Sequence, residues 1–315
     1  MVNPPNDSPW SLLFLDQTKA DQKAAKRIQE ALEKLHIPFE AFALESPDML
    51  RRKARSLAKE GKKKFLAAGR EEALNATMNG MLEDELKVPA DHVLGFIPSG
   101  EAKNWHPSVG IPSSPEEAAR NLKLGHYFYQ DLGLATYIKD GQVNQTYFLN
   151  AAALGWLGKA SQNLSEKRAK GKKVKTLAEI KRQLQHWKGM EVEISIDGTC
   201  VYQGPCFSLS VHLGQAHGQG FVHAPNAIPD DGLFEIQLIP QLTTFERYSK
   251  WSAIRQSSFM LEPMIKSWQG EQIEVNTAKA LPLALDESYV GEAPARLDCL
   301  YQRLRIISML KNMQP

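Results

Sequence analysis

The first third of the chain alternates short strand-like runs with segments of helical periodicity, and this alternation limits its fold more than any other feature. The helical segments carry apolar residues on one face and charges on the other. Alternating strands and helices predict a mostly parallel sheet covered by helices on both faces. The predicted strands are Trp10–Leu15, Phe39–Leu44, Lys64–Ala67 and Val93–Ile97, and the predicted helices contain Ile28, Leu32 and Leu35, span Asp48–Lys59, begin near Ala73 and follow an N-cap at Ser114.

After Leu132 the segments become strand-like, and glycines or Asp-Gly pairs fall between or beside them. Such turns are typical of an antiparallel sandwich or barrel. We therefore expect an α/β domain at 1–131 and a β-rich domain at 132–302, with the final segment 303–315 returning to the first. The strand-like segments are Gln145–Asn150, Glu191–Ile196, Cys206–Leu213, Phe234–Leu238, Gln272–Val275 and Leu304–Ile307, and helical interruptions are expected at Ser165–Trp187 and Thr244–Trp268.

Composition excludes several functional classes. The 38 Lys and Arg residues nearly balance the 36 Asp and Glu residues, which argues against a dedicated nucleic-acid binder. Cys200, Cys206 and Cys299 form no CxxC pair, as expected of reduced structural thiols. The amino terminus lacks a signal pattern, and the longest apolar runs fall short of the roughly 18 residues that a spanning helix needs. We expect a cytoplasmic protein, at most peripheral to a membrane, and leave a homodimer open.

The most informative local motif follows the predicted strand that ends at Ala67. In an open α/β sheet, ligands bind beyond the carboxyl ends of the strands, so the turn at Gly69 is well placed to meet one. A phosphate site there needs glycines for close backbone approach and a helix whose free N–H groups point at the anion. Only one glycine is present in Gly69-Arg70-Glu71-Glu72-Ala73, which is followed by Leu74-Asn75 and Asn79-Gly80.

These residues resemble the Gly-Gly-Asp-Gly-Thr signature of the diacylglycerol kinase catalytic-domain family, which includes bacterial lipid kinases and sphingosine and ceramide kinases. A second family element, Pro-x-Gly-Thr-x-Asn-Asp, is similar to the segment from Pro98 to Asn104. The resemblance is collinear from about Trp10 to Ile307. Its further matches are Gly110-Ile111-Pro112, Asp131-Leu132-Gly133, Phe148-Leu149-Asn150 with Gly155, Gly218-Gln219-Gly220, Pro225-Asn226-Ala227, Asp230-Asp231-Gly232-Leu233-Phe234 and Asp286-Glu287-Ser288, where the family has Asp-Gly-Glu.

The resemblance implies a fold like that of NAD kinase and diacylglycerol kinase, with ATP's γ-phosphoryl group transferred to a hydroxyl of a lipid between the two domains. It implies that Asp286 is the base that accepts the hydroxyl proton. It also implies a structural magnesium near the turn of Asp230 and Asp231. The nucleotide-binding residues that it implies are Gly69, Arg70, Glu71, Asn75, Gly100 and Glu101.

Departures from the family signature bear on activity. Arg70 and Glu72 replace glycines, which adds Cβ atoms where backbone would meet phosphate and disfavours a positive φ. Glu72 and Glu101 place carboxylates near the polyphosphate, and two like charges about 4 Å apart repel by about 4 kcal/mol at an effective dielectric near 20. Arg70 offsets part of this repulsion. We therefore expect weak ATP binding or a different ligand pose, and two hypotheses stay open: a lipid kinase, or a catalytically silent lipid- or ligand-binding module of the same fold.

Several residues have simpler interpretations that the sequence leaves open. Asp286 also suits a solvated turn, and Gly100 suits a turn without phosphate contact. The acids after Arg70 suit an ordinary helix start, and Asn75 and Asn79 suit local contacts within one helix. His212, His217 and His223 lack the HExxH spacing of a zinc site. The basic residues Lys167, Arg168, Lys170, Lys172, Lys173 and Lys175 suit either a solvated helix or contact with an anionic membrane.

Overall fold

The computed structural model describes residues 8–83, 92–99, 104–170, 175–217, 221–249, 251 and 262–310. The chain divides into two compact units, each described below by itself. Unit 1 comprises Met1–Leu132, Pro229–Asp231 and Tyr301–Pro315, and unit 2 comprises Gly133–Ile228 and Gly232–Leu300. Two long strands, β5 (His126–Lys139) and β17 (Ser288–Ser308), contribute residues to both units.

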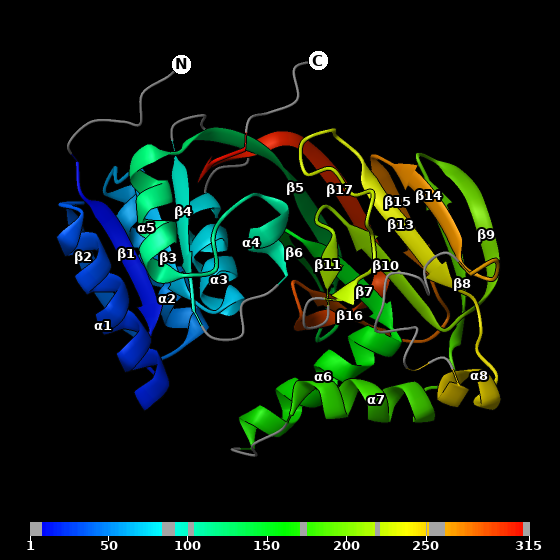
Figure 1. Ribbon diagram of the computed structural model, residues 1–315. Helices are drawn as coiled ribbons and strands as arrows, with labels where there is room; N and C mark the ends of the chain where they lie inside the picture. Colours follow the sequence, from blue (N-terminus) through cyan, green and yellow to red (C-terminus); the bar gives the residue numbers. More distant parts are fainter. Residues whose placement is uncertain are drawn as a thin grey trace. The chain divides into compact units, whose positions relative to one another are not determined.

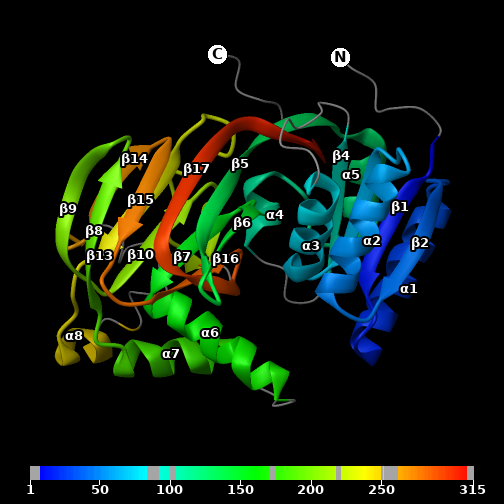
Figure 2. The same cartoon turned by 180° about the vertical axis from the view of Figure 1, so that it is seen from behind.

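Unit 1 is built on a parallel sheet whose strands lie in the order β4-β3-β1-β2, and the end of β17 joins the sheet beside β4. Helices α1 and α5 contact each other on one face, and α2 and α3 contact each other on the other face (Figures 1 and 2). The elements are β1 (Trp10–Leu15), α1 (Lys19–Lys34), β2 (Phe39–Leu44), α2 (Pro47–Lys59), β3 (Lys64–Gly69), α3 (Glu71–Leu82), β4 (Val93–Pro98), α4 (Trp105–Ser108) and α5 (Pro115–Leu124).

The alternating pattern of the sequence explains these elements. Strands β1 and β4 are buried along their whole length, as expected of strands with helices on both sides. The helices begin at predicted signals: Ser114 Oγ accepts the N–H of Glu117, and Pro115 occupies the first turn of α5. The α/β architecture predicted for the first part of the chain is therefore confirmed.

Unit 2 is a β-sandwich of antiparallel strands. One run of strands has the order β14-β13-β10-β7-β16-β17, and a second run pairs β17 with β15, β15 with β8, and β8 with β9. The core between them is apolar and includes Phe148, Phe234 and Leu297. The strands are β6 (Gln142–Phe148), β7 (Ala151–Gly155), β8 (Met190–Ile196), β9 (Thr199–Cys206), β10 (Ser208–His212), β11 (Ala216–His217), β12 (Phe221–Val222), β13 (Phe234–Ile239), β14 (Lys266–Gly270), β15 (Gln272–Asn276) and β16 (Leu281–Leu285).

Three helices lie along one edge of unit 2, at the bottom of Figures 1 and 2: α6 (Trp156–Ala169), α7 (Thr176–His186) and α8 (Thr244–Ser249). Helix α6 contacts β7, β16 and α7, and α7 contacts α8. A second apolar cluster, which contains Trp156, Ile180 and Phe207, fills the space beneath them. Within the described residues, no helix is both long and apolar enough to cross a bilayer.

The structure differs from the predicted elements at three places. Helix α6 begins at Trp156, nine residues before the helix expected at Ser165, because its buried tryptophan belongs to the apolar cluster and not to a strand. Lys266–Trp268 was expected to be helical but forms part of edge strand β14, in which Trp268 pairs with Ile236 of β13. The strand expected at Leu304–Ile307 is only the end of the longer strand β17. Asp131, near the expected boundary, lies inside β5, and the first segment of unit 1 ends at the next residue, Leu132.

Candidate functional site

The turn that follows β3 lies at the carboxyl edge of the parallel sheet in unit 1. Gly69 has φ +110°, which glycine adopts readily, and its carbonyl accepts the N–H of Ser99 at 2.9 Å, so the ends of β3 and β4 are tied together. A Cβ added at Gly69 would meet only the Ser99 hydroxyl, at 3.8 Å. The backbone at this edge thus keeps the open approach that a phosphate site needs.

Helix α3 starts directly after this turn. Its N-cap residue, Arg70, makes no side-chain capping bond, and the first turn carries Glu71 and Glu72. Neither Arg70 nor Glu72 has a positive φ, so the strain expected from replacing glycines there is not found. A helix N-terminus attracts negative charge, and the two glutamates already supply it. Their carboxylates therefore compete with the phosphate that this position would otherwise attract.

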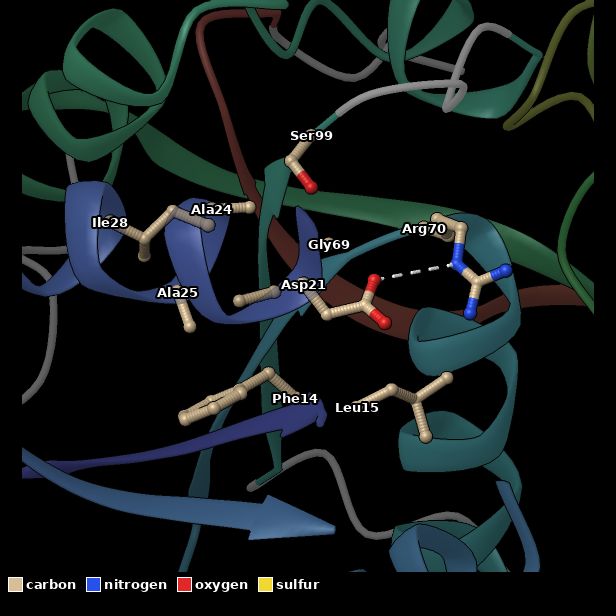
Figure 3. A pocket seen from close by; sticks show the side chains of 10 residues that line it. Phe14, Leu15, Asp21, Ala24, Ala25, Ile28, Gly69, Arg70 and Ser99 are labelled. Atoms are coloured by element: carbon tan, nitrogen blue, oxygen red, sulfur yellow. Dashed lines mark ion pairs between the residues drawn. The ribbon is translucent and has the colours of Figure 1, made fainter. Parts of the chain in front are cut away.

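Arg70 lies beside a small cavity at the turn (Figure 3). Its Nη2 donates to Gln17 Oε1 at 3.0 Å and lies 3.6 Å from Glu72 Oε2, while its Nε lies 4.0 Å from Asp21 Oδ1. One loop residue, Gln17, and one residue from each of two helices, Asp21 of α1 and Glu72 of α3, thus surround the guanidinium. The cavity measures about 10 Å³, room for about one water molecule, and is lined by Phe14, Leu15, Asp21, Ala24, Ala25, Ile28, Ala68, Gly69, Arg70 and Ser99.

Asp21 and Gln17 were missed by sequence reasoning. Asp21 takes part in the N-cap of α1, where the Thr18 hydroxyl donates to Asp21 Oδ2 at 2.9 Å and accepts the Asp21 N–H at 3.1 Å. The Thr-x-x-Asp spacing just after a predicted strand was the available signal, because it marks a helix start at the same sheet edge as Gly69. Among the described residues near Gly69, the Arg70 guanidinium thus lies beside the carboxylates of Asp21 and Glu72, and Glu71 adds another carboxylate in the first turn of α3.

Glu71 has a clear structural task. Its carboxylate accepts the backbone N–H of Asn104 at 2.8 Å, the Asn104 side-chain amide at 2.7 Å and the Trp105 N–H at 2.9 Å. These bonds fix the start of α4 to the start of α3, and Trp105 in turn donates to Gln130 Oε1 at 2.9 Å. Glu71, which stands at the Asp position of the family signature, thus binds N–H groups of Asn104 and Trp105.

The Asn-Gly part of the signature is explained by packing. Asn79 donates from its side-chain amide to the carbonyl oxygen and to the Oδ1 of Asn75, both at 3.1 Å, and these are local contacts within one helix. A Cβ added at Gly80 would lie 2.2 Å from the Arg51 carbonyl oxygen of α2. Glycine is required there because α2 and α3 pack backbone against backbone. Gly100 and Glu101, the other predicted nucleotide-binding residues, lie outside the described residues.

Asp286 forms the turn between β16 and β17 in unit 2. With Glu287 it occupies a two-residue loop in which both have positive φ, 45° and 67°, as in the tightest hairpins. Its carboxylate accepts three backbone N–H groups: Leu149 at 2.9 Å, Asn150 at 2.9 Å and Ala151 at 3.1 Å. With 9% exposure, Asp286 is not the solvated turn residue that one interpretation expected. Its three amide bonds stabilise the ionised carboxylate and tie the hairpin to the start of β7.

Asp230, near which a structural magnesium is expected, lies in a buried, hydrogen-bonded turn. The side chain of Asp230 is buried, and its carbonyl accepts the amide of Gln302 at 3.5 Å; Asp131 Oδ1 accepts the Gln302 N–H at 2.6 Å. His212 and His223 are buried, with ring centroids 6.1 Å apart. Over the described part of the chain, no group of three or more His, Cys, Asp or Glu could hold a metal ion. The structural magnesium expected near Asp230 and Asp231 stays a prediction.

A buried carboxylate anchors the helices of unit 2. Glu179 of α7 accepts from Lys167 of α6 at 2.6 Å and from Arg182 at 2.7 Å. Burial alone would raise the pKa of Glu179, but hydrogen bonds from Arg182, Lys167 and Gln183 together lower it to about 2. Lys167, one of the residues predicted to contact a membrane, is thus engaged within the protein. Lys172 and Lys173 lie outside the described residues.

Comparison with known proteins gives the same picture over nearly the whole chain. Residues 12–135 match the diacylglycerol kinase catalytic domain, and residues 151–308 match the YegS C-terminal NAD kinase beta sandwich-like domain. The chain is 25% identical over 254 residues to a diacylglycerol kinase of Bacillus subtilis, covering 77% of each chain, and 22% identical over 284 residues to one of Staphylococcus carnosus, covering 87% of this chain and 86% of that one.

Solved structures show a similar fold. A diacylglycerol kinase of Bacillus anthracis superposes with a TM-score of 0.69 at 18% identity, covering 96% of this chain and 98% of that one. A yeast NADH kinase complexed with NADH gives a TM-score of 0.52 at 10% identity, covering 98% and 88%. The predicted combination of an α/β unit and a β-sandwich, as in the NAD kinase and diacylglycerol kinase folds, is confirmed.

Proposed function

Because this chain belongs to the diacylglycerol kinase-like family, we propose that it is a lipid kinase-like protein that binds a diacylglycerol-like lipid but binds ATP too weakly for efficient phosphoryl transfer. The observation that carries the proposal is the position of Arg70. Its guanidinium, held by Gln17, Asp21 and Glu72, lies beside the turn where the family resemblance places the phosphates. A protein of this fold that binds lipid but transfers no phosphoryl group would be a pseudokinase.

The groups around this turn do not favour a nucleoside triphosphate, which supports the proposed weak binding of ATP. The cavity beside Arg70 measures about 10 Å³, which is room for about one water molecule. A triphosphate at this turn would also approach the carboxylates of Asp21 and Glu72, and two like charges about 4 Å apart repel by about 4 kcal/mol at an effective dielectric near 20. The charged groups at the turn therefore form ion pairs with one another within the protein more readily than they would bind a polyphosphate.

Unit 2, which would hold the lipid, keeps the aspartate of the family signature at Asp286. The carboxylate of Asp286 accepts three backbone N–H groups, and Asp286 itself lies in a hairpin turn with φ 45°. In the silent module that we propose, Asp286 positions the segment from Leu149 to Ala151 and lines the polar end of the lipid site.

A second candidate function, an active ATP-dependent lipid kinase, is favoured by one specific observation. Gly69 keeps its positive φ and open approach, and the N-terminus of α3 has no side-chain cap. If Arg70 swings away from Asp21, this turn offers N–H groups to a phosphate. Asp286 would then accept the proton of the lipid hydroxyl as the γ-phosphoryl group of ATP is transferred to it.

We also propose that the protein works in the cytoplasm at the surface of an anionic membrane, which a lipid ligand requires. Arg168, Lys170 and Lys175 are exposed and remain available for such contact, whereas Lys167 is bound to Glu179. A homodimer stays a proposal that light scattering at several protein concentrations would test.

Phosphoryl transfer separates the two candidate functions. The purified chain is incubated with magnesium and radiolabelled ATP in mixed micelles that contain dioleoylglycerol, ceramide or sphingosine. We expect no lipid phosphorylation above background, together with measurable binding of water-soluble dihexanoylglycerol by calorimetry. Phosphorylation of any of these lipids, lost in a folded Asp286→Asn variant, would establish the kinase; absence of both transfer and lipid binding would remove the lipid function.

A further inference from the structure

Helix α8 presents two large aromatic side chains to solvent. Phe245 is 79% exposed and Tyr248 is 61% exposed, and at a spacing of three residues they share one face of the helix. We call this pair the aromatic edge. Phe245 has the largest exposed fraction among the exposed large apolar side chains of the described residues. Exposed aromatic groups that gather in one place mark an interaction surface.

The protein holds this helix firmly although it has only six residues. Thr243 and Glu246 form a reciprocal capping box: the Thr243 N–H and hydroxyl donate to Glu246 Oε2 at 2.8 and 2.7 Å, and the Thr243 hydroxyl accepts the Glu246 N–H at 3.2 Å. Arg247 donates to the carbonyls of Leu242 and Gln185, the latter on α7. The aromatic edge is thus presented by an anchored element and not by a loose loop.

Positive charge lies along the neighbouring helix. On α7 and at its N-cap, Lys175, Lys181 and Arg182 are exposed, and Leu177 adds a 37% exposed apolar side chain. The acids of α7 and α8 are already bound: Glu179 is buried with Lys167 and Arg182, and Glu246 closes the capping box. Helix α6, which contacts α7, carries an exposed acid at Glu166. The charge that α7 and α8 direct to solvent is therefore positive.

We propose that the aromatic edge and the basic side chains of α7 form a docking surface for an anionic lipid bilayer. Aromatic rings suit the boundary between headgroups and acyl chains, and exposed lysines attract anionic headgroups. The two helices lie along one margin of unit 2 in both views (Figures 1 and 2). The inference rests on the proposed function in one respect, because a lipid ligand gives the protein a reason to reach a bilayer.

Vesicle cosedimentation tests the docking surface. Wild-type protein is mixed with vesicles of phosphatidylcholine alone or of equal parts phosphatidylcholine and phosphatidylglycerol. We expect binding to the anionic vesicles only, weakened at least about tenfold in F245S/Y248S because two aromatic side chains no longer leave water. The K175Q/K181Q variant should bind about fivefold less tightly per charge removed, and salt should weaken wild-type binding. V143S is the matched control, since Val143 of β6 is 71% exposed but lies on another element.

The outcomes are distinct. Equal binding of F245S/Y248S and wild type, or no binding of wild type to anionic vesicles, would overturn the proposal. Conversion of a dimer to a monomer by F245S/Y248S, seen by light scattering, would also overturn it by assigning the surface to a second copy. Binding of dihexanoylglycerol in solution is measured in parallel. It should be unchanged in F245S/Y248S, so loss of docking is distinguished from failure of the lipid-binding function.

Discussion

Two turns that carry the family resemblance differ in what they keep of the family signature. The turn after β3 in unit 1 keeps its backbone, with Gly69 at φ +110°, but its side chains are now an arginine among carboxylates. The turn at Asp286 in unit 2 keeps its carboxylate, which is buried and accepts three N–H groups. The comparison teaches that the carboxylate of Asp286 has a structural task, the binding of three N–H groups, whatever its part in chemistry. Its presence therefore says little about activity, whereas the side chains beside Gly69 say a great deal.

The largest expected effect comes from removing the Asp286 carboxylate. In Asp286→Ala, three amides near the start of β7 lose their acceptor, and each unsatisfied buried group costs about 1–3 kcal/mol, so unfolding free energy should fall by about 3 kcal/mol or more. Urea denaturation followed by circular dichroism measures this.

Asp298→Asn serves as the control, because Asp298 pairs with Arg296 at the surface and its loss should change stability by less than about 1 kcal/mol. An Asp286→Ala variant as stable as wild type would mean that the carboxylate is free for chemistry, and the contrast between the two turns would disappear.

A second carboxylate of unit 2, Glu179, has cationic partners instead of amides. Its pKa of about 2 lies below its ordinary 4.5, so its contribution to stability is present above pH 4.5 and is lost as pH falls toward 2. Since Lys167 and Arg182 are partly exposed, we expect this contribution to be about 1–3 kcal/mol at pH 7.

Glu179→Gln should lose that stability at neutral pH and show a flatter stability profile between pH 2 and 4.5 than wild type. Urea midpoints measured across this range provide the test. Parallel profiles for the two proteins would show that Glu179 does not titrate as described.

In unit 1 the Asn-Gly element sharpens the comparison, because it separates packing from ligand binding. Alanine in a helix is intrinsically favoured over glycine by about 1 kcal/mol, but the Cβ of Gly80→Ala would approach the Arg51 carbonyl to 2.2 Å. Overpacking against backbone should win, with a net destabilisation of about 1–3 kcal/mol. Thermal unfolding measures the sign directly, and a more stable variant would show that α2 and α3 do not pack as tightly as described.

Much of this structure could be predicted from sequence, and the exceptions have physical causes. Periodicity indicated the strands of unit 1, and capping residues indicated its helices. The contacts of Arg70 with Gln17 and Asp21 could not be read, because they form only when β1 and β3 lie side by side in the sheet. The bonds from Asn104 and Trp105 to Glu71 likewise depend on tertiary structure. Lys266–Trp268 joined a strand because pairing with β13 outweighed its local preference.

The smallest expected effect restores the family glycines. In R70G/E72G the guanidinium and one carboxylate leave the turn, so ATP with magnesium should bind about tenfold more tightly than to wild type. K26G/E30G, which removes an exposed Lys–Glu pair from α1 with the same change in charge, should leave ATP binding unchanged. If both variants bind ATP as wild type does, the side chains at the turn are not what weakens nucleotide binding.

The central claim is that the rewritten turn of unit 1 no longer holds a triphosphate. Calorimetric titration of the wild-type chain with ATP and magnesium tests it most directly. The account predicts no saturable heat up to about millimolar nucleotide, where the binding free energy would be only about 4 kcal/mol. Saturable binding at micromolar ATP would contradict the account and would make the chain a nucleotide-binding kinase despite Arg70.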